Sequence, residues 1–230
     1  IKVQGKKTTT SQKVDIVFVL DNSASMQGNV SKANDAIRNF MKVLVPDLIT
    51  NTNPDIRFGL VVYGTNIRST KNLTSNKNTI SDALPDKVAG DPYSFYGATN
   101  TQLGLQKGQS LFDSVNSKKY IVLLTDGVPT VHQKITSVGP LYQGDPSINK
   151  YGSTDNYGTY MATDFSSNSR WGSGSNYKLG QYTGAFSDRQ KYTVNSAPEI
   201  EDNGFAAISQ GRIIRKAGIE IFGIAMGLND

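Results

Sequence analysis

Short apolar runs alternate with amphipathic stretches along most of this chain. The runs at 14–20, 56–63, 120–126 and 219–226 are apolar almost throughout, which is typical of strands buried on both faces of a parallel sheet. The segment 67–74 is more polar and predicts an edge strand. The pattern therefore predicts a sheet with a buried centre.

Between these runs, apolar residues recur at steps of three and four positions. The stretch 29–45 predicts a helix with one buried stripe, weakened or ended by Pro46. The stretch 101–115 predicts a second helix despite two internal glycines, and a third begins near Glu199. Strands that alternate with helices favour a doubly wound, Rossmann-like α/β fold, with a mainly parallel sheet and helices on both faces.

The first buried run ends in three oxygen donors at alternating positions, Asp21, Ser23 and Ser25. Carboxylate and hydroxyl oxygens suit Mg²⁺ or Mn²⁺, which prefer octahedral oxygen coordination. An acid followed by small polar residues is also the composition of an ordinary turn or helix N-cap. These three residues alone leave both interpretations open.

Two later segments add donors that the fold would bring to the same place. Thr99 precedes the predicted helix at 101–115, and Asp126 ends the run at 120–126. In an open parallel sheet, ligand-binding groups gather at the carboxyl ends of the strands. Asp21, Ser23, Ser25, Thr99 and Asp126 are therefore predicted to share one metal site.

This ordered set, Asp21-x-Ser23-x-Ser25, then Thr99, then Asp126 within Thr-Asp-Gly, resembles the metal-ion-dependent adhesion site of von Willebrand factor A domains. The resemblance runs from about residue 14 to residue 227 and implies a domain that holds Mg²⁺ or Mn²⁺ and grips an acidic side chain of a protein ligand. It also implies that Asp21, Ser23 and Ser25 bind the metal directly, and that Thr99 and Asp126 bind directly or through water.

A long segment, 131–198, departs from the family, which usually has a short connection here. It is rich in Gly, Ser, Asn, Thr and Tyr, and we expect an inserted arm with some β structure of its own. Its aromatic residues either form the core of the arm or contact a ligand, as tyrosines do in antibody paratopes. Its tyrosines and its tryptophan are Tyr142, Tyr151, Tyr157, Tyr160, Trp171, Tyr177, Tyr182 and Tyr192.

The arm begins directly after the strand that ends in Asp126, so its root is expected beside the metal. Asn22, Tyr93, Tyr96 and Trp171 are the candidate rim residues that a ligand would meet there. Inserted arms of this kind resemble those of tip adhesins from Gram-positive pili. That resemblance implies an extracellular, surface-attached virulence protein, with a host matrix or cell-surface protein as ligand and other pilus subunits as partners.

Composition limits the alternatives. The chain has 230 residues, 37% hydrophobic and 19% charged, so one core and one domain suffice, with 1–13 as a lead-in. No apolar run is long enough to span a bilayer, and the start lacks the order of a signal peptide, so we expect a piece of a longer, secreted protein. There is no cysteine, and the net charge of +5 is scattered, which disfavours nucleic acid as a partner.

Enzymatic functions lack their motifs. A serine hydrolase needs a base, but the single histidine, His132, lies in a polar segment typical of a surface position, and no G-x-S-x-G elbow is present. There is also no phosphate-binding G-x-x-x-x-G-K-[ST] loop.

A non-enzymatic function is therefore expected: metal-dependent adhesion or, as the alternative, a non-adhesive assembly module of a larger surface complex. The family's final strand and helix, which follow the segment 219–226, are missing from the chain, so we expect that this fragment cannot switch between states.

Overall fold

The computed structural model describes residues 12–45, 55–87, 97–127, 129–140, 160–171 and 203–227. Its centre is a five-stranded sheet in the order β3-β2-β1-β4-β7. These strands are β1 (Val14–Asp21), β2 (Ile56–Tyr63), β3 (Ile67–Thr74), β4 (Lys118–Thr125) and β7 (Glu220–Ala225). Only β3 is antiparallel to its neighbour within this sheet, which confirms the mainly parallel architecture.

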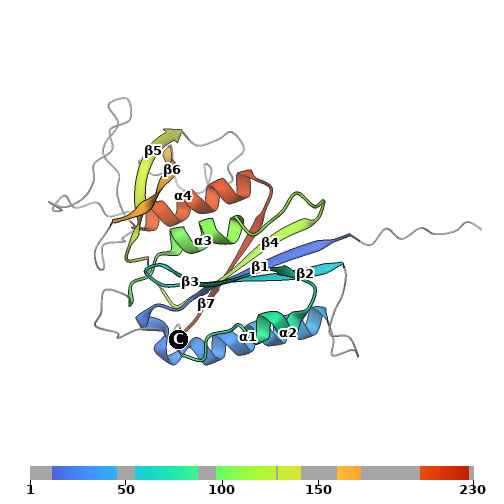
Figure 1. Cartoon of the computed structure of the whole chain (residues 1–230). Coiled ribbons are helices and arrows are strands. Elements are labelled where there is room, and N and C mark those ends of the chain that lie inside the picture. The colour runs from blue at the N-terminus through green and yellow to red at the C-terminus, as the bar shows by residue number, and fades with distance from the viewer. Residues whose placement is uncertain are drawn as a thin grey trace, which may run out of the picture.

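Helices cover both faces of the sheet (Figure 1). On one face lie the short 3-10 helix η1 (Ala24–Gly28), α1 (Val30–Leu44) and α2 (Lys77–Ser81), packed on strand residues such as Phe18 and Leu60. On the other face lie α3 (Thr101–Gln109) and α4 (Asn203–Lys216), which pack on the alternate residues of the same strands. Because successive side chains of a strand point to opposite faces, the continuous apolar runs supply both cores.

The helix predicted over 101–115 was wrong in its second half, because α3 ends at Gln109. The Ser110 hydroxyl donates to the carbonyl of Lys107 over 2.7 Å, and Leu111 and Phe112 then pack against the sheet as part of a loop. Apolar residues that continue a helical spacing can thus pack against a sheet, partly buried, without being helical.

The final strand was predicted to be buried, and that was also wrong. β7 is the outermost strand of the described sheet and pairs with β4. Phe222 is 52% exposed and Ile224 is 38% exposed. Phe222 packs against one aromatic neighbour, Tyr120, with ring centroids 6.0 Å apart. An edge strand can carry the same apolar pattern as a central one.

The segment 131–198 contains an antiparallel ribbon, which agrees with the expectation of some β structure there. It is formed by β5 (His132–Pro140) and β6 (Tyr160–Trp171), and Figure 1 shows it beside α4, on the same side of the sheet as α3. Ile135, Ala162 and Phe165 of the ribbon form a small separate core with Phe205 and Ala206 of α4. Residues 141–159 and 172–198 of this segment lie outside the described residues.

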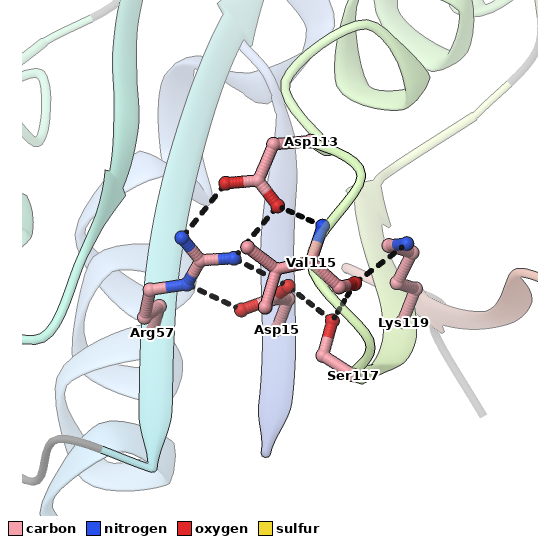
Figure 2. A network of polar contacts seen from close by, with 6 residues as sticks. All are labelled: Asp15, Arg57, Asp113, Val115, Ser117 and Lys119. Atoms are coloured by element: carbon pink, nitrogen blue, oxygen red, sulfur yellow. Dashed lines mark hydrogen bonds and ion pairs between the residues drawn. The ribbon is translucent and has the colours of Figure 1, made fainter.

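A polar network lies at the amino ends of β1, β2 and β4, opposite to the carboxyl ends of β1 and β4 (Figure 2). Arg57 Nε donates to buried Asp15 over 2.7 Å, and Arg57 Nη1 donates to Asp113 over 2.9 Å. Ser117 also donates to Asp15. The arginine therefore ties β1 and β2 to the loop between α3 and β4.

Candidate metal site

The candidate site lies at the carboxyl ends of β1 and β4. The chain passes from β1 to β2 and β3 on one side and then places β4 on the other side of β1. The strand order therefore reverses between β1 and β4, and such a switch point is where open α/β sheets bind their ligands. Asp21 is the last residue of β1, and Asp126 follows the last residue of β4.

Asp21 is a fully buried carboxylate with two hydrogen-bond donors. Its Oδ1 accepts from the Ser23 backbone N–H over 2.8 Å, and its Oδ2 accepts from the Thr125 hydroxyl over 2.7 Å. Burial raises the pKa of Asp21 to about 6, although the bonds from Thr125 and Ser23 oppose that rise and the nearby charge of Asp126 adds to it. The ionised form of Asp21 would gain from an adjacent cation.

Hydroxyl groups connect Asp21 to Asp126. Ser23 Oγ lies 3.2 Å from Ser25 Oγ, and the Ser25 hydroxyl donates to Asp126 Oδ1 over 2.9 Å. The structure thus brings together four of the five residues that the sequence predicts as metal ligands. They come from two loops that are far apart in the chain.

Thr99 is buried in the neighbouring loop, directly before α3. Asn100 caps this helix through a bond from the Leu103 N–H to its side-chain oxygen, and the Asn100 N–H donates to the carbonyl of Gly64. The backbone of Thr99 is bonded to Thr130, four positions after Asp126. The Thr99 loop therefore lies beside the loop that follows Asp126, and coordination by the Thr99 hydroxyl stays a prediction.

Among the described residues, no group of three His, Cys, Asp or Glu side chains is placed to hold a metal. The candidate set instead combines two carboxylates with the hydroxyls of Ser23, Ser25 and Thr99. Uncharged and carboxylate oxygens in this mixture fit Mg²⁺ or Mn²⁺ and do not fit a metal that requires thiolate or imidazole ligands. The buried charge of Asp21 is a second feature that fits a cation.

Three residues around the site were not singled out from the sequence. Thr125 donates to Asp21, and the only mark of it in the sequence is its place in Thr-Asp-Gly. Tyr63 is fully buried, and burial raises its pKa, with the charge of Asp21 acting in the same direction. Arg68 has a pKa lowered by burial, which the charge of Asp21 opposes. No sequence pattern marks Tyr63 or Arg68 as site residues.

The predicted rim is described only in part. Asn22 is buried, and its side-chain amide donates to the Lys87 carbonyl over 3.2 Å. Tyr93 and Tyr96 lie outside the described residues. Trp171 pairs with His132 through the backbone of the ribbon, and only its backbone is described. Contact of these four residues with a ligand stays a prediction.

His132 is not at the surface, contrary to expectation. It is 2% exposed, its Nδ1 lies 2.6 Å from the Gln133 carbonyl oxygen, and burial lowers its pKa. The polar composition of its segment is misleading because residues 131–133 form the buried root of the ribbon. Burial of this kind suits a structural histidine.

Comparisons with known proteins agree with this architecture. The family model of the von Willebrand factor type A domain matches residues 15–155. The inter-alpha-trypsin inhibitor heavy chain H1 of Homo sapiens is 31% identical over 131 residues, which is 53% of this chain. The matched part spans 13% of the length of that relative.

Two solved structures share the fold. The pilus adhesin SpaC from Lactobacillus rhamnosus GG, in its open conformation, has a TM-score of 0.68 at 24% identity, covering 96% of this chain and 24% of that one. The vWF domain of the type V pili tip protein Mfa5 from Porphyromonas gingivalis has a TM-score of 0.57 at 17% identity. The match covers 94% of this chain and 82% of that one. Since the family model matches more than half of the residues, this chain belongs to the von Willebrand factor type A domain family.

Proposed function

We propose that this chain is a metal-dependent adhesion domain that binds an acidic group of a host protein through a divalent cation. The hydrogen-bonded series from Asp21 through Ser23 and Ser25 to Asp126 carries the proposal. It places two carboxylates and two hydroxyls at one sheet edge, with the Thr99 loop beside them. Mg²⁺ or Mn²⁺ is the proposed cation.

The protein groups have distinct parts in this proposal. Asp21 supplies a buried negative charge, and Ser23 and Ser25 supply neutral oxygens. Ser25 also holds Asp126 at a fixed place through their hydrogen bond. With Thr99 and Asp126 binding directly or through water, a coordination position is left for the ligand. A bound dication supplies the positive charge that a ligand carboxylate needs in a partly desolvated place.

The proposed setting is the bacterial cell surface, in a pilus tip protein of a Gram-positive bacterium, where a longer parent protein would contact other pilus subunits. The pilus proteins that share the fold support a place in a pilus. In the part of the chain that the structure describes, no helix is long and apolar enough to cross a bilayer. The proposed ligand is a host extracellular matrix or cell-surface protein that presents an Asp or Glu.

An assembly module of a surface complex is the second candidate. Its metal site would hold a structural cation, and its partners would be pilus subunits. The ribbon formed by β5 and β6 favours adhesion, because it starts six residues after Asp126 and extends the surface available to a ligand beside the site.

The proposal is tested by adhesion of the purified domain to immobilised host matrix proteins, in Mg²⁺ or Mn²⁺ and in excess EDTA. Asp21→Ala removes one of the two carboxylates, and Asp35→Ala is the matched control, because the Asp35 side chain is 64% exposed on α1. We expect binding to be lost in EDTA and in Asp21→Ala, and to be retained in Asp35→Ala.

The ligand side of the proposed bond is tested in the same assay. Amidation of the ligand's carboxylates should weaken binding, and Asp126→Ala in the domain should impair it. Adhesion that persists fully in excess EDTA would contradict the metal mechanism. Metal-dependent binding to pilus subunits, without binding to any matrix protein, would favour the assembly module.

A further inference from the structure

Thr99 and Thr130 are bonded to each other in both directions. The Thr99 N–H donates to Thr130 Oγ1 over 2.9 Å, and the Thr130 N–H donates to the Thr99 carbonyl over 2.9 Å. The Val131 N–H donates to the same carbonyl over 3.2 Å. Thr99 is 4% exposed. Both polar groups of its backbone are therefore fixed by the segment that follows Asp126.

The same segment also holds the start of α3. The Gln133 N–H, on β5, donates to Gln102 Oε1 over 3.1 Å, and Gln102 is a fully buried residue in the first turn of the helix. Thr99 and Gln102 thus lie on one side of this contact, and Thr130 and Gln133 lie on the other. The root of the ribbon and the loop before α3 form one hydrogen-bonded unit.

We propose that Thr130 is a positioning residue, which sets the place of Thr99 in the metal site through the bond from the Thr99 N–H to its hydroxyl. This inference rests on the proposed function. Mg²⁺ requires near-ideal octahedral geometry with oxygens at about 2.0–2.1 Å. A ligand whose backbone shifts by a fraction of an ångström therefore loses much of its bond. Groups that orient metal ligands typically contribute about 10–100-fold to metal affinity.

The bond between Thr99 and Thr130 also connects the metal site to the ribbon. Thr130 lies between Asp126 and β5, so it joins the two loops that carry Asp126 and Thr99 to the root of the ribbon. A force or a ligand that displaces the ribbon would act on Thr99 through this residue. A ligand that alters metal affinity in this way would have its own affinity altered by the metal to the same degree.

The test uses calorimetric titration of the whole chain with Mn²⁺. Thr130→Val keeps the shape of the side chain and removes the acceptor, and Thr130→Ser restores the hydroxyl. Thr136→Val is the matched control on an exposed position of β5. We expect Mn²⁺ affinity to fall by roughly tenfold or more in Thr130→Val. It should stay within about threefold of the parent in Thr130→Ser, and Thr136→Val should not differ from the parent.

A purely structural role is separated by comparing Thr130→Ala with Thr130→Ser, both measured for Mn²⁺ affinity and for thermal unfolding in EDTA. The inference requires the alanine variant to bind more weakly than the serine variant. Equal affinities for these two, or parent-like affinity in Thr130→Val, would overturn it while leaving the proposed function intact. Failure of the parent chain itself to bind Mn²⁺ would overturn the proposed function and this inference together.

Discussion

The hydroxyl of Ser25 donates to Asp126 over 2.9 Å, although the two residues are 101 positions apart in the chain. The strand order produces this contact. β2 and β3 follow β1 in the chain and lie on one side of it, and β4 then pairs with β1 on its other side. The candidate site therefore exists only in the folded sheet. Its residues can be changed one at a time to separate metal binding from folding.

Asp21→Asn should abolish metal binding and stabilise the metal-free protein at neutral pH. Asparagine is similar to the protonated carboxyl: its Oδ1 can accept from the Ser23 N–H, and its amide can donate to the Thr125 hydroxyl. Burial raises the pKa of Asp21 from 3.8 to about 6. A rise of about two units corresponds to roughly 3 kcal/mol, so we expect a gain on the order of 1–3 kcal/mol.

The pH dependence of this gain has a definite sign. Because the folded-state pKa is raised, the contribution of Asp21 to stability is complete below pH 3.8 and is lost as the pH rises through about 6. Urea unfolding in EDTA should show little difference between variant and parent near pH 4 and a clear difference at pH 7.5. A parent chain that is the more stable of the two at pH 7.5 without metal would contradict this account.

Shortening the connection between β5 and β6 should reduce adhesion without affecting the metal site. Pro140 and Tyr160 are paired across β5 and β6, so a two-residue Asn-Gly turn can replace residues 141–159. We expect unchanged Mn²⁺ affinity and weaker or redirected adhesion. Removal of the whole 131–197 segment is a poorer test, because it would expose Phe205 of α4. Parent-like adhesion of the shortened chain would show that residues 141–159 do not contact the ligand.

Gly104→Ala should destabilise the domain. A Cβ at Gly104 would lie 2.7 Å from Tyr63 Cδ1, and Tyr63 is fully buried. Overpacking of this kind costs about 1–3 kcal/mol. Gly211→Ala on α4 is the control, since its Cβ would meet its nearest atom at 3.8 Å, and the better helix propensity of alanine should stabilise by up to about 1 kcal/mol. The midpoint of thermal unfolding is measured for both variants. Equal changes of this midpoint would argue against close packing of α3 on Tyr63.

Asp113→Asn should destabilise the domain above pH 4. In acid, the variant and the parent should be equally stable. The bonds from Arg57 lower the pKa of Asp113 to about 2, so its contribution to stability is present above its ordinary pKa of 3.8 and is lost as the pH falls through 2. Urea midpoints of the variant and the parent should converge between pH 4 and pH 2. A constant difference across that range would mean that the ion pair is not its source.

The sequence predicted most of the sheet because burial on both faces leaves a direct pattern, a continuous apolar run. It also predicted Asp21, Ser23, Ser25 and Asp126 as neighbours, because strand ends meet at one edge of a parallel sheet. The same pattern could not distinguish an edge strand from a central one, so the exposure of Phe222 was missed.

Other features depend on contacts between distant segments, which no local pattern encodes. The two glycines of α3 looked unfavourable for a helix, yet Gly104 allows the helix to approach Tyr63. His132 lies in a polar segment but is buried at the root of the ribbon. Thr130 has no distinguishing sequence context, and its importance follows from its bonds to Thr99.

The small core between the ribbon and α4 has a consequence for local stability. Ile135, Phe165 and Phe205 form a cluster separate from the two larger cores on the faces of the sheet. Regions with less buried apolar surface open at a lower free energy than the rest of a protein. Amide hydrogens of β5 should therefore exchange with solvent faster than those of β1. A ligand that contacts the ribbon should slow exchange in β5 more than exchange in β1.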